Sequence, residues 1–190
     1  MPGPVTSQDM DLLAVVATGI WAMLPAYIPN NVAVLAGGGP PIDGGRSWRG
    51  SRILGDGKTW RGTVFGIGAG ILVAVLLNGI HSSTVVITGI SLPTFSGRAM
   101  VALPTGAMLG DIAASFVKRR MGRARGSALP IVDQLDFVVL ALLLAAFLDP
   151  EWFVRVFTAP VLGVVLVLTP ALHVGTNAIA FWLGLKDEPW

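Results

Sequence analysis

The sequence predicts an all-α integral membrane protein, folded as a single transmembrane domain over residues 1–190. Of its 190 residues, 53% are hydrophobic and only 13% are charged, and the mean hydropathy is +0.72. A chain of this size cannot bury so many apolar side chains in one water-soluble core, so lipid must surround much of its surface. The chain has no cysteine, which excludes disulfides, thiolate metal sites and cysteine nucleophiles.

Five apolar stretches are candidate transmembrane helices when compared with a hydrocarbon core about 30 Å thick. They run over residues 10–36, 63–80, 99–117, 133–148 and 158–184. The first contains Pro25 and Pro29, so we expect it to be kinked or broken. The fourth reaches a spanning length only if it begins near Asp133. No lysine or arginine precedes the first stretch, so we expect no removable signal peptide.

The positive charges predict the orientation of the chain. The loops at 37–62 and 118–132 each carry five lysines or arginines, and Lys186 lies in the tail. The opposite side has only Arg98 and Arg155. The excess of positive charge on cytoplasmic loops therefore predicts an N-terminus outside, a C-terminus in the cytoplasm and two basic cytoplasmic loops. A simpler interpretation is that most of these cations only set the topology and contact anionic lipids.

Small residues recur every four positions on the second and third apolar stretches. They are Gly62, Gly66 and Gly70 on the second, and Gly106, Gly110 and Ala114 on the third. Such strips let helix backbones approach closely, so we expect these two helices to pack together. An antiparallel pair would place residues 55–62 beside residues 115–120 at the cytoplasmic face. Packing alone is enough to explain the glycines.

The segment GDGKTWRG at 55–62 contains Gly57, Lys58 and Thr59, which match the last three residues of the phosphate-binding P-loop motif. The glycine that this motif needs five positions before Gly57 is replaced by Arg52, and no buried strand precedes the loop, so a P-loop is excluded. What remains is a glycine turn with Lys58, Thr59 and Arg61, a combination suited to phosphate oxygens. An ordinary juxtamembrane loop would also fit this segment.

Three carboxylates point to a metal site at the membrane edge. Asp111 lies inside the third apolar stretch, about 10 Å below Lys118 at 1.5 Å per helical residue. Asp133 and Asp136 are three residues apart, on one face if the helix has already begun. Together they would bind a hard divalent cation such as Mg²⁺ beneath the basic loops. The alternatives are a structural pair of Asp111 with Ser115 or Lys118, and compensation of a helix dipole by Asp133 and Asp136.

The two histidines do not make a ligand set. His81 falls on the predicted outer side. His173 forms a polar stripe with Thr169 and Asn177 on the fifth apolar stretch, which favours a hydrogen-bonded seam between helices rather than a site.

The segment GDIAASFVKRRMGRARGSALPIVDQLDF at 110–137 resembles the signature region of the CTP-dependent cytidylyltransferases that make CDP-diacylglycerol. In that family an S-x-x-K-R stretch precedes a D-x-x-D pair. With GDGKTWRG and LPIVDQLDF, the sequence is more similar to the archaeal branch, the CDP-archaeol synthases. The bacterial branch has more spans and an HGG element where Pro130, Ile131 and Val132 stand here. This departure argues against a bacterial-type diacyl substrate.

The resemblance implies transfer of CMP from CTP to the phosphate of an isoprenoid glycerol phosphate, 2,3-bis-O-(geranylgeranyl)-sn-glycerol 1-phosphate, with release of pyrophosphate. It implies Mg²⁺ on Asp111, Asp133 and Asp136. Lys58, Lys118 and Arg119 would act with these aspartates in catalysis. The residues expected to bind the phosphates of CTP or of the lipid are Gly55, Asp56, Gly57, Lys58, Thr59, Arg61, Ser115, Lys118 and Arg119. The expected location is the cell membrane with the active site on the cytoplasmic side, and no nucleic acid partner is expected.

Other functions remain compatible with the sequence. A CDP-diacylglycerol synthase acting on phosphatidate would use the same charged residues. A small lipid-phosphate kinase or phosphatase would use the same cations and metal. An ion-coupled transporter would use Asp111 as its ion site. The oligomeric state is not indicated by any pattern in the sequence.

Overall fold

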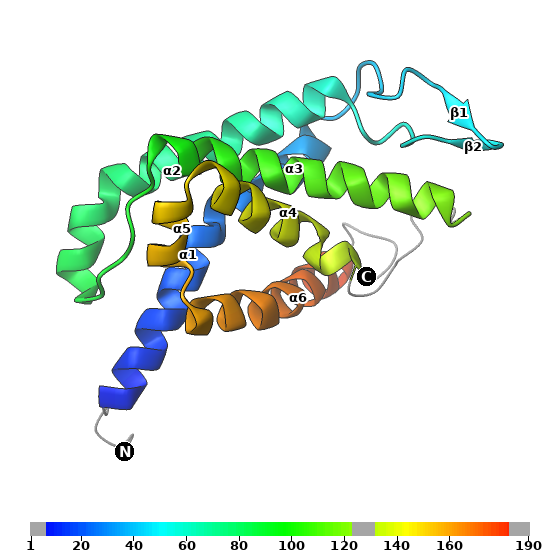
Figure 1. Ribbon diagram of the computed structural model, residues 1–190. Helices are drawn as coiled ribbons and strands as arrows, with labels where there is room; N and C mark the ends of the chain where they lie inside the picture. The colour runs from blue at the N-terminus through cyan, green and yellow to red at the C-terminus, as the bar shows by residue number, and fades with distance from the viewer. Residues whose placement is uncertain (1–6, 123–131, 183–190) are drawn as a thin grey trace.

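A computed structural model of the chain describes residues 7–122 and 132–182. Helices dominate this part of the chain, with one small hairpin (Figure 1). In chain order the elements are α1 Ser7–Leu35, β1 Ser47–Trp48, β2 Ser51–Arg52, α2 Trp60–Thr88, α3 Gly97–Arg120, α4 Val132–Leu148, α5 Pro150–Val156 and α6 Ala159–Trp182. The mostly helical prediction is confirmed, and the antiparallel pair of β1 and β2 is an addition to it.

Three helices of the described segments are long and apolar enough to cross a membrane: Leu12–Leu35 within α1, α2 and α3. α5 and α6 also pass as a pair, but they are bent by 80° at the break between them. α4 has 17 residues, and its apolar part is shorter than a usual span. Within residues 7–122 and 132–182 this gives three candidate spans, or four if the bent pair counts as one. The predicted number of five is therefore not confirmed.

The second apolar helix is longer than predicted. α2 continues eight residues past the expected end at residue 80, to Thr88. The hydroxyls of Thr84 and Thr88 donate to the carbonyls of Ile80 and Thr84, so these polar residues continue the helix rather than end it. Gly89 then ends α2 in the left-handed conformation, with φ of 69°.

Both basic loops are shorter than predicted, because helices extend into them. α2 begins at Trp60, so Arg61 is a helical residue. α3 continues to Arg120, which places Lys118 and Arg119 in its last turn, where cations favour the negative end of the helix dipole. Arg123, Arg125 and Lys186 lie outside the described residues.

The short helix α5 occupies a segment that the sequence analysis left as a connection. The Asp149 side chain accepts the Trp152 backbone N–H, and Pro150 occupies the first turn, two features that start helices. Asp149 also accepts a hydrogen bond from the Ser96 hydroxyl at the start of α3. The end of α4 is thereby fixed beside the beginning of α3.

The glycine strip of α2 packs mainly on α1. A Cβ atom added to Gly62 would lie 2.8 Å from the carbonyl oxygen of Ala33, and one added to Gly66 would lie 2.7 Å from that of Pro29. α2 also contacts α3, because the same Cβ on Gly66 would lie 3.0 Å from the sulfur of Met108. The predicted pairing with α3 is present, but the closest backbone approach is to α1. α1 itself runs unbroken through both of its prolines.

The glycine strip of α3 packs on α4 rather than on α2. A Cβ atom on Gly106 would lie 2.5 Å from the Leu140 carbonyl oxygen. At Gly110, a Cβ would overlap the backbone of Asp136 and Phe137. α4 therefore runs antiparallel to α3, and Asp136 and Phe137, one turn after the beginning of α4, lie level with Gly110.

The polar stripe on α6 contributes to a seam with α1. The hydroxyl groups of Tyr27 and Thr169 form a hydrogen bond of 2.8 Å. The side chains of His173 and Asn177 lie outside the described set. On α2, the ring of His81 bonds the Leu92 carbonyl oxygen, so this histidine holds the connection between α2 and α3.

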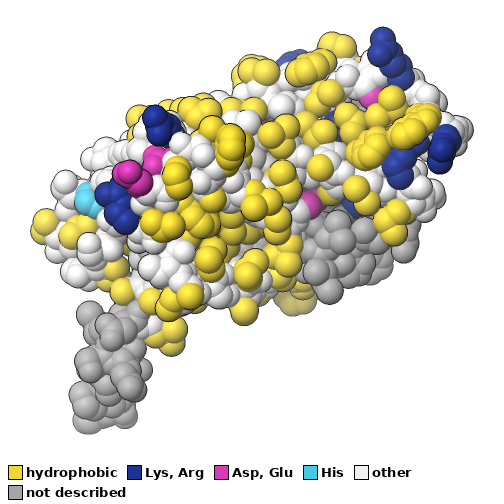
Figure 2. Space-filling view, viewed as in Figure 1, with side chains coloured by type: hydrophobic (Ala, Val, Ile, Leu, Met, Phe, Trp, Pro, Cys, Tyr) yellow, Lys and Arg dark blue, Asp and Glu magenta, His cyan; other side chains and the backbone are white. Residues whose placement is uncertain are grey.

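The surface is predominantly apolar between two charged ends. Figure 2 shows hydrophobic side chains over the middle of the molecule, with lysines and arginines gathered toward its ends. Large apolar side chains on α2 such as Phe65, Leu72 and Leu76 are more than half exposed. In water such a belt would be unfavourable, so it indicates a surface that faces lipid.

Candidate active site

The first basic loop folds around Asp43, a residue that the sequence analysis did not select. Its buried carboxylate accepts backbone N–H groups from Gly45, Leu54 and Gly55 at 3.0, 3.0 and 3.1 Å. It also accepts two N–H groups of Arg52, at 2.7 and 3.2 Å. The Arg52 guanidinium and these backbone donors hold the pKa of the Asp43 carboxyl well below its usual range. One carboxylate thus holds together both halves of the loop.

The hairpin is fixed to the end of α3 by Arg120. Its guanidinium donates to the carbonyl oxygens of Trp48, Ser51 and Arg52 at 2.6, 3.2 and 2.8 Å. The ring of Trp48 stacks on Phe116, with 6.2 Å between centroids. Arg120 also lies over both rings, at 5.1 and 5.5 Å. These contacts join the hairpin to the end of α3, and the predicted approach of residues 55–62 to residues 115–120 is confirmed where Gly55 lies beside the Arg119 side chain.

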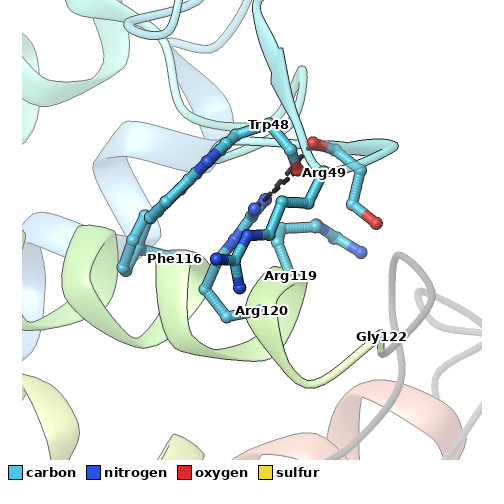
Figure 3. A pocket seen from close by; sticks show the side chains of 7 residues that line it. Trp48, Arg49, Phe116, Arg119, Arg120 and Gly122 are labelled. Atoms are coloured by element: carbon cyan, nitrogen blue, oxygen red, sulfur yellow. Dashed lines mark hydrogen bonds between the residues drawn. The ribbon is translucent and has the colours of Figure 1, made fainter.

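A cavity of about 460 Å³ lies between the hairpin and α3. Figure 3 shows Arg49, Arg119 and Arg120 around it, with the rings of Trp48 and Phe116 on one side. The complete lining is Trp48, Arg49, Ser51, Phe116, Arg119, Arg120 and Gly122. Guanidinium groups bind phosphate oxygens in pairs, and aromatic faces stack on planar rings, so the cavity suits a phosphorylated ligand.

The glycine turn of residues 55–59 lies between this cavity and α2. Gly55 has a φ of 102°, a conformation that favours glycine. The Arg119 side chain lies beside it and donates from Nε to the Leu54 carbonyl oxygen at 3.5 Å. Thr59 is buried, and its hydroxyl accepts the Gly62 N–H at 3.1 Å as the N-cap of α2.

Two other residues expected at the phosphates have protein partners in the structure. Arg61 donates to the carbonyl oxygens of Ala36 and Gly37 at 2.7 and 2.5 Å, and so clamps the end of α1 to α2. The largely exposed Asp56 carboxylate accepts from Arg52 at 2.5 Å. The contacts of Arg61 and Asp56 therefore stabilise the loop and the helix ends.

Lys58 and Asp111 form an ion pair that joins the first loop to α3. The Lys58 Nζ atom lies 2.5 Å from the Asp111 Oδ2 atom, and the two side chains are 24% and 26% exposed. The contact partner of Asp111 comes from a different segment, rather than from Ser115 or Lys118 one and two turns along its own helix. Partial withdrawal from water strengthens the attraction between the two charges.

A second, smaller cavity of about 70 Å³ opens beside this ion pair. Its lining combines the glycine turn with residues of α1, α2 and α3: Asn30, Ala33, Val34, Gly57, Lys58, Thr59, Gly62, Thr63, Met108 and Asp111. At about 30 Å³ per water molecule, it can hold roughly two waters or an ion with one water. Both Gly57 and Lys58 therefore border a space next to a carboxylate.

The crossing of α3 and α4 brings Asp136 to the same region. Gly110 touches the Asp136 backbone, and Asp111 is the next residue on α3. The partly buried Asp136 carboxylate accepts its neighbouring Phe137 N–H at 2.6 Å. Asp133 lies in the first turn of α4, but its side chain is outside the described set.

A three-ligand metal cluster is not present among the side chains that the structure describes. Asp111 and Asp136 nevertheless contribute carboxylate oxygens, the donors that Mg²⁺ prefers. Ser115 and Lys118 continue the α3 face of Asp111 and are partly buried. The donor chemistry of this crossing therefore fits a magnesium ion.

Sequence reasoning missed Asp43, Arg120 and Asn30. Asp43 acts through backbone groups two to twelve residues away in its own loop, and Arg120 through carbonyl groups about 70 residues earlier. No spacing of residues reveals either set of contacts. Asn30 had a visible signal, because it is a polar side chain inside an apolar stretch next to Pro29.

Comparison with known proteins identifies the family. Residues 12–190 match the model described as CarS-like, CDP-archaeol synthase. A CDP-archaeol synthase of Halobacterium salinarum is 61% identical over 181 residues, covering 95% of this chain and 100% of its relative. One from Archaeoglobus fulgidus is 47% identical, covering 94% and 100%.

The structural comparison agrees with this. A solved structure described as an intramembrane enzyme for archaeal membrane lipid biosynthesis matches with a TM-score of 0.65 and 34% identity. The match covers 85% of this chain and 94% of the other. On these grounds the chain belongs to the CarS-like family of CDP-archaeol synthases.

Proposed function

We propose that the protein transfers CMP from CTP to the phosphate of 2,3-bis-O-(geranylgeranyl)-sn-glycerol 1-phosphate, giving CDP-archaeol and pyrophosphate for membrane lipid synthesis. The observation that carries the proposal is the Lys58–Asp111 ion pair in a chain of this family. It joins a glycine turn suited to phosphate with a carboxylate suited to a divalent cation. The protein is a CTP-dependent nucleotidyltransferase of the membrane.

The reaction needs charge neutralisation more than proton transfer. A phosphomonoester has a second pKa near 6, so the lipid phosphate is mostly a dianion at neutral pH and needs no general base. One of its oxygens attacks the α-phosphorus of CTP, and the bond from that phosphorus to the β-phosphate oxygen breaks. The electron pair leaves with pyrophosphate. The main obstacle is the repulsion between two polyanions, which positioned cations reduce.

The cations at the end of α3 support a phosphate-binding role. Lys58 would leave Asp111 for a phosphate oxygen when the substrate enters. Lys118 and Arg119 would hold the remaining phosphates, and Arg119 borders both the glycine turn and the larger cavity. Gly55 and Gly57 would shape the turn, while Ser115 would bond a phosphate oxygen.

Mg²⁺ is proposed on Asp111, Asp133 and Asp136. When bound, the ion would neutralise charge on the phosphates of CTP. The oxygen donors at the α3–α4 crossing support this assignment. These carboxylates would hold the ion beside the cations of the glycine turn and of α3, which would bind the phosphates.

We place the site on the cytoplasmic side, with the N-terminus outside. The distribution of lysines and arginines supports this orientation, because the basic ends of the first loop and of α3 lie together. Cytosolic CTP would then reach the site directly.

One assay tests the proposed reaction. Purified protein is incubated with CTP, Mg²⁺ and the geranylgeranyl lipid phosphate, and CDP-lipid and pyrophosphate are measured. We expect the two products in equal amounts. In a parallel incubation with ATP in place of CTP, formation of ADP would indicate a lipid kinase. Free phosphate would indicate a phosphatase, and no turnover with either nucleotide would favour a transporter.

The lipid is tested in a parallel reaction with a diacyl phosphatidate of similar chain length. Both lipids present the same phosphate, so selectivity must come from the apolar surface that receives the chains. Each misplaced group in such a groove contributes about 1–3 kcal/mol, and several add up. We expect far faster conversion of the isoprenoid lipid. Equal conversion of the diacyl lipid would contradict the proposed archaeal lipid substrate but would not contradict the cytidylyl transfer.

A further inference from the structure

The side-chain oxygen of Asn30 is buried and lacks a hydrogen-bond partner. Its Oδ1 atom is one of only two such buried atoms among the described side chains, the other being Nε of Arg120. Buried polar groups in native proteins are nearly always paired, so an exception needs a physical explanation. The neighbouring Asn31 offers a contrast, because it is exposed and donates to the Tyr27 carbonyl oxygen at 3.4 Å.

The position of Asn30 is fixed by the packing of α1 on α2. The residue before it, Pro29, presents its carbonyl oxygen to Gly66, and Ala33, one turn later, presents its own to Gly62. A side chain at either glycine would separate the two helices. Asn30 is therefore held on a rigid helix at the contact itself.

Asn30 lines the 70 Å³ cavity that also contains Lys58 and Asp111. The cavity thus brings together a neutral amide oxygen and a carboxylate from two different helices. The Lys58 ammonium is occupied by Asp111 at 2.5 Å and does not reach the amide oxygen within hydrogen-bond distance. Both oxygen groups accept hydrogen bonds or bind cations. The cation in this lining, Lys58, is thus paired with the carboxylate and not with the amide oxygen.

We propose that the Asn30 Oδ1 atom is a ligand of the divalent cation that Asp111 binds. An amide oxygen and a carboxylate are both typical donors for a hard cation, and the cavity has room for one ion with a water. The inference rests on the proposed function, since it places Asn30 at the metal of the nucleotidyl transfer. It adds α1 to a site otherwise built from α3 and α4.

The test uses Mn²⁺, which electron paramagnetic resonance detects directly, with the purified full-length chain in detergent and no CTP. Free Mn²⁺ is titrated against the wild type, Asn30→Ala, Asn30→Asp and the matched control Asn31→Ala. We expect Asn30→Ala to weaken Mn²⁺ binding by about 10-fold or more. Asn30→Asp keeps an oxygen donor and retains binding, and Asn31→Ala behaves like the wild type.

Thermal unfolding separates a ligand from a structural residue. Without metal, Asn30→Ala removes an unpaired polar atom, so its stability is equal to or higher than that of the wild type. With Mn²⁺, the wild type is stabilised in proportion to its affinity, and Asn30→Ala loses this gain. The inference would be overturned if Asn30→Ala were less stable without metal and yet bound Mn²⁺ normally. That result would show that a water molecule donates a hydrogen bond to the amide oxygen.

The wild-type CTP assay distinguishes this inference from the proposed reaction. A wild type that forms CDP-lipid while Asn30→Ala binds Mn²⁺ normally overturns the ligand role alone. A wild type that fails to bind Mn²⁺ overturns it as well. If the wild type makes no CDP-lipid but binds Mn²⁺, and Asn30→Ala has lost this binding, the proposed reaction is contradicted and the metal site is supported.

Discussion

The proposed chemistry depends on the contact between Lys58 and Asp111. This contact predicts that substitutions of the two residues lower the activity in a non-additive way. Asp111→Asn removes a carboxylate from a half-buried site, and Lys58→Ala removes the cation expected at the phosphates. We expect each variant to lower kcat by roughly 10²–10³-fold, the usual effect of losing one charge-stabilising group. The double variant should lose much less than the product of the two, because the residues act as a unit. Pyrophosphate release measures all three.

The control for this series is Glu151→Gln, on α5 at the opposite end of α4. It should keep wild-type activity and extract from the membrane equally well. Near-normal turnover in Asp111→Asn would reduce the ion pair to a structural contact.

Asp43 gives a prediction about pH. Its folded-state pKa is depressed, with the Arg52 hydrogen bonds as the largest cause. A depressed pKa contributes stability above the unfolded value of about 3.9, and this stability is lost as the pH falls through the folded value. The loop should therefore stay protected from hydrogen exchange between neutral pH and about pH 4, and lose protection only in stronger acid.

Asp43→Asn should expose the same loop at neutral pH, because an amide presents N–H groups to the donors of Leu54 and Gly55. Hydrogen exchange measured by mass spectrometry over residues 40–58 checks this. Asp56→Asn is the matched control, since its largely exposed carboxylate pairs with the Arg52 side chain and accepts none of the loop's backbone N–H groups that Asp43 holds. Equal exchange in both variants would contradict the central role of Asp43.

At the scale of helices, Gly110 sets the distance between α3 and α4 and so the relation of Asp111 to Asp136. Gly110→Ala would force the Asp136 backbone away, at a cost of about 1–3 kcal/mol for overpacking. We expect a lower Tm and a loss of turnover, measured on the same purified sample. Gly68→Ala is the control, because a Cβ at Gly68 meets nothing within 4 Å. A Tm unchanged in Gly110→Ala would show that α4 can shift freely.

The helices themselves were largely predictable from the sequence, because apolar length is a local property. α1, α3 and α4 begin and end within about three residues of the predicted stretches, a usual uncertainty for helix ends. The extension of α2 was not predictable from hydropathy, since Thr84 and Thr88 continue the helix through their own hydroxyl bonds. The predicted contact of α2 with α3 is present, but the closest partner of each glycine strip was missed, because a strip shows that a backbone comes close without showing which one.

The candidate site was predictable in its charges but not in its connections. Lys58 and Asp111 were selected separately by loop chemistry and by the rarity of a carboxylate in an apolar helix. Their pairing depends on how α2 and α3 meet, which is a property of the folded chain. The same applies to Arg120, whose three carbonyl partners lie about 70 residues earlier in the hairpin.

For the whole molecule, the orientation predicts which face reacts with an impermeant thiol reagent. The chain has no cysteine, so single cysteines report one position each. Ser47→Cys in the hairpin and Ser127→Cys, which lies outside the described residues, should react only after the cytoplasmic face is opened. Ser91→Cys, exposed between α2 and α3, should react in intact cells. Labelling of Ser47→Cys from outside would reject the orientation and a site for cytosolic CTP.

The short α4 has a consequence for the surrounding bilayer. Its 17 residues span about 26 Å, less than a hydrocarbon core of about 30 Å. Asp136, the fifth residue of α4, lies level with Gly110, ten residues before the end of α3, which corresponds to a depth of about 15 Å. Hydrophobic mismatch of this kind is relieved by local thinning of the membrane. A lipid beside α4 would then carry its phosphate toward the level of Asp111 while its chains stay in the bilayer.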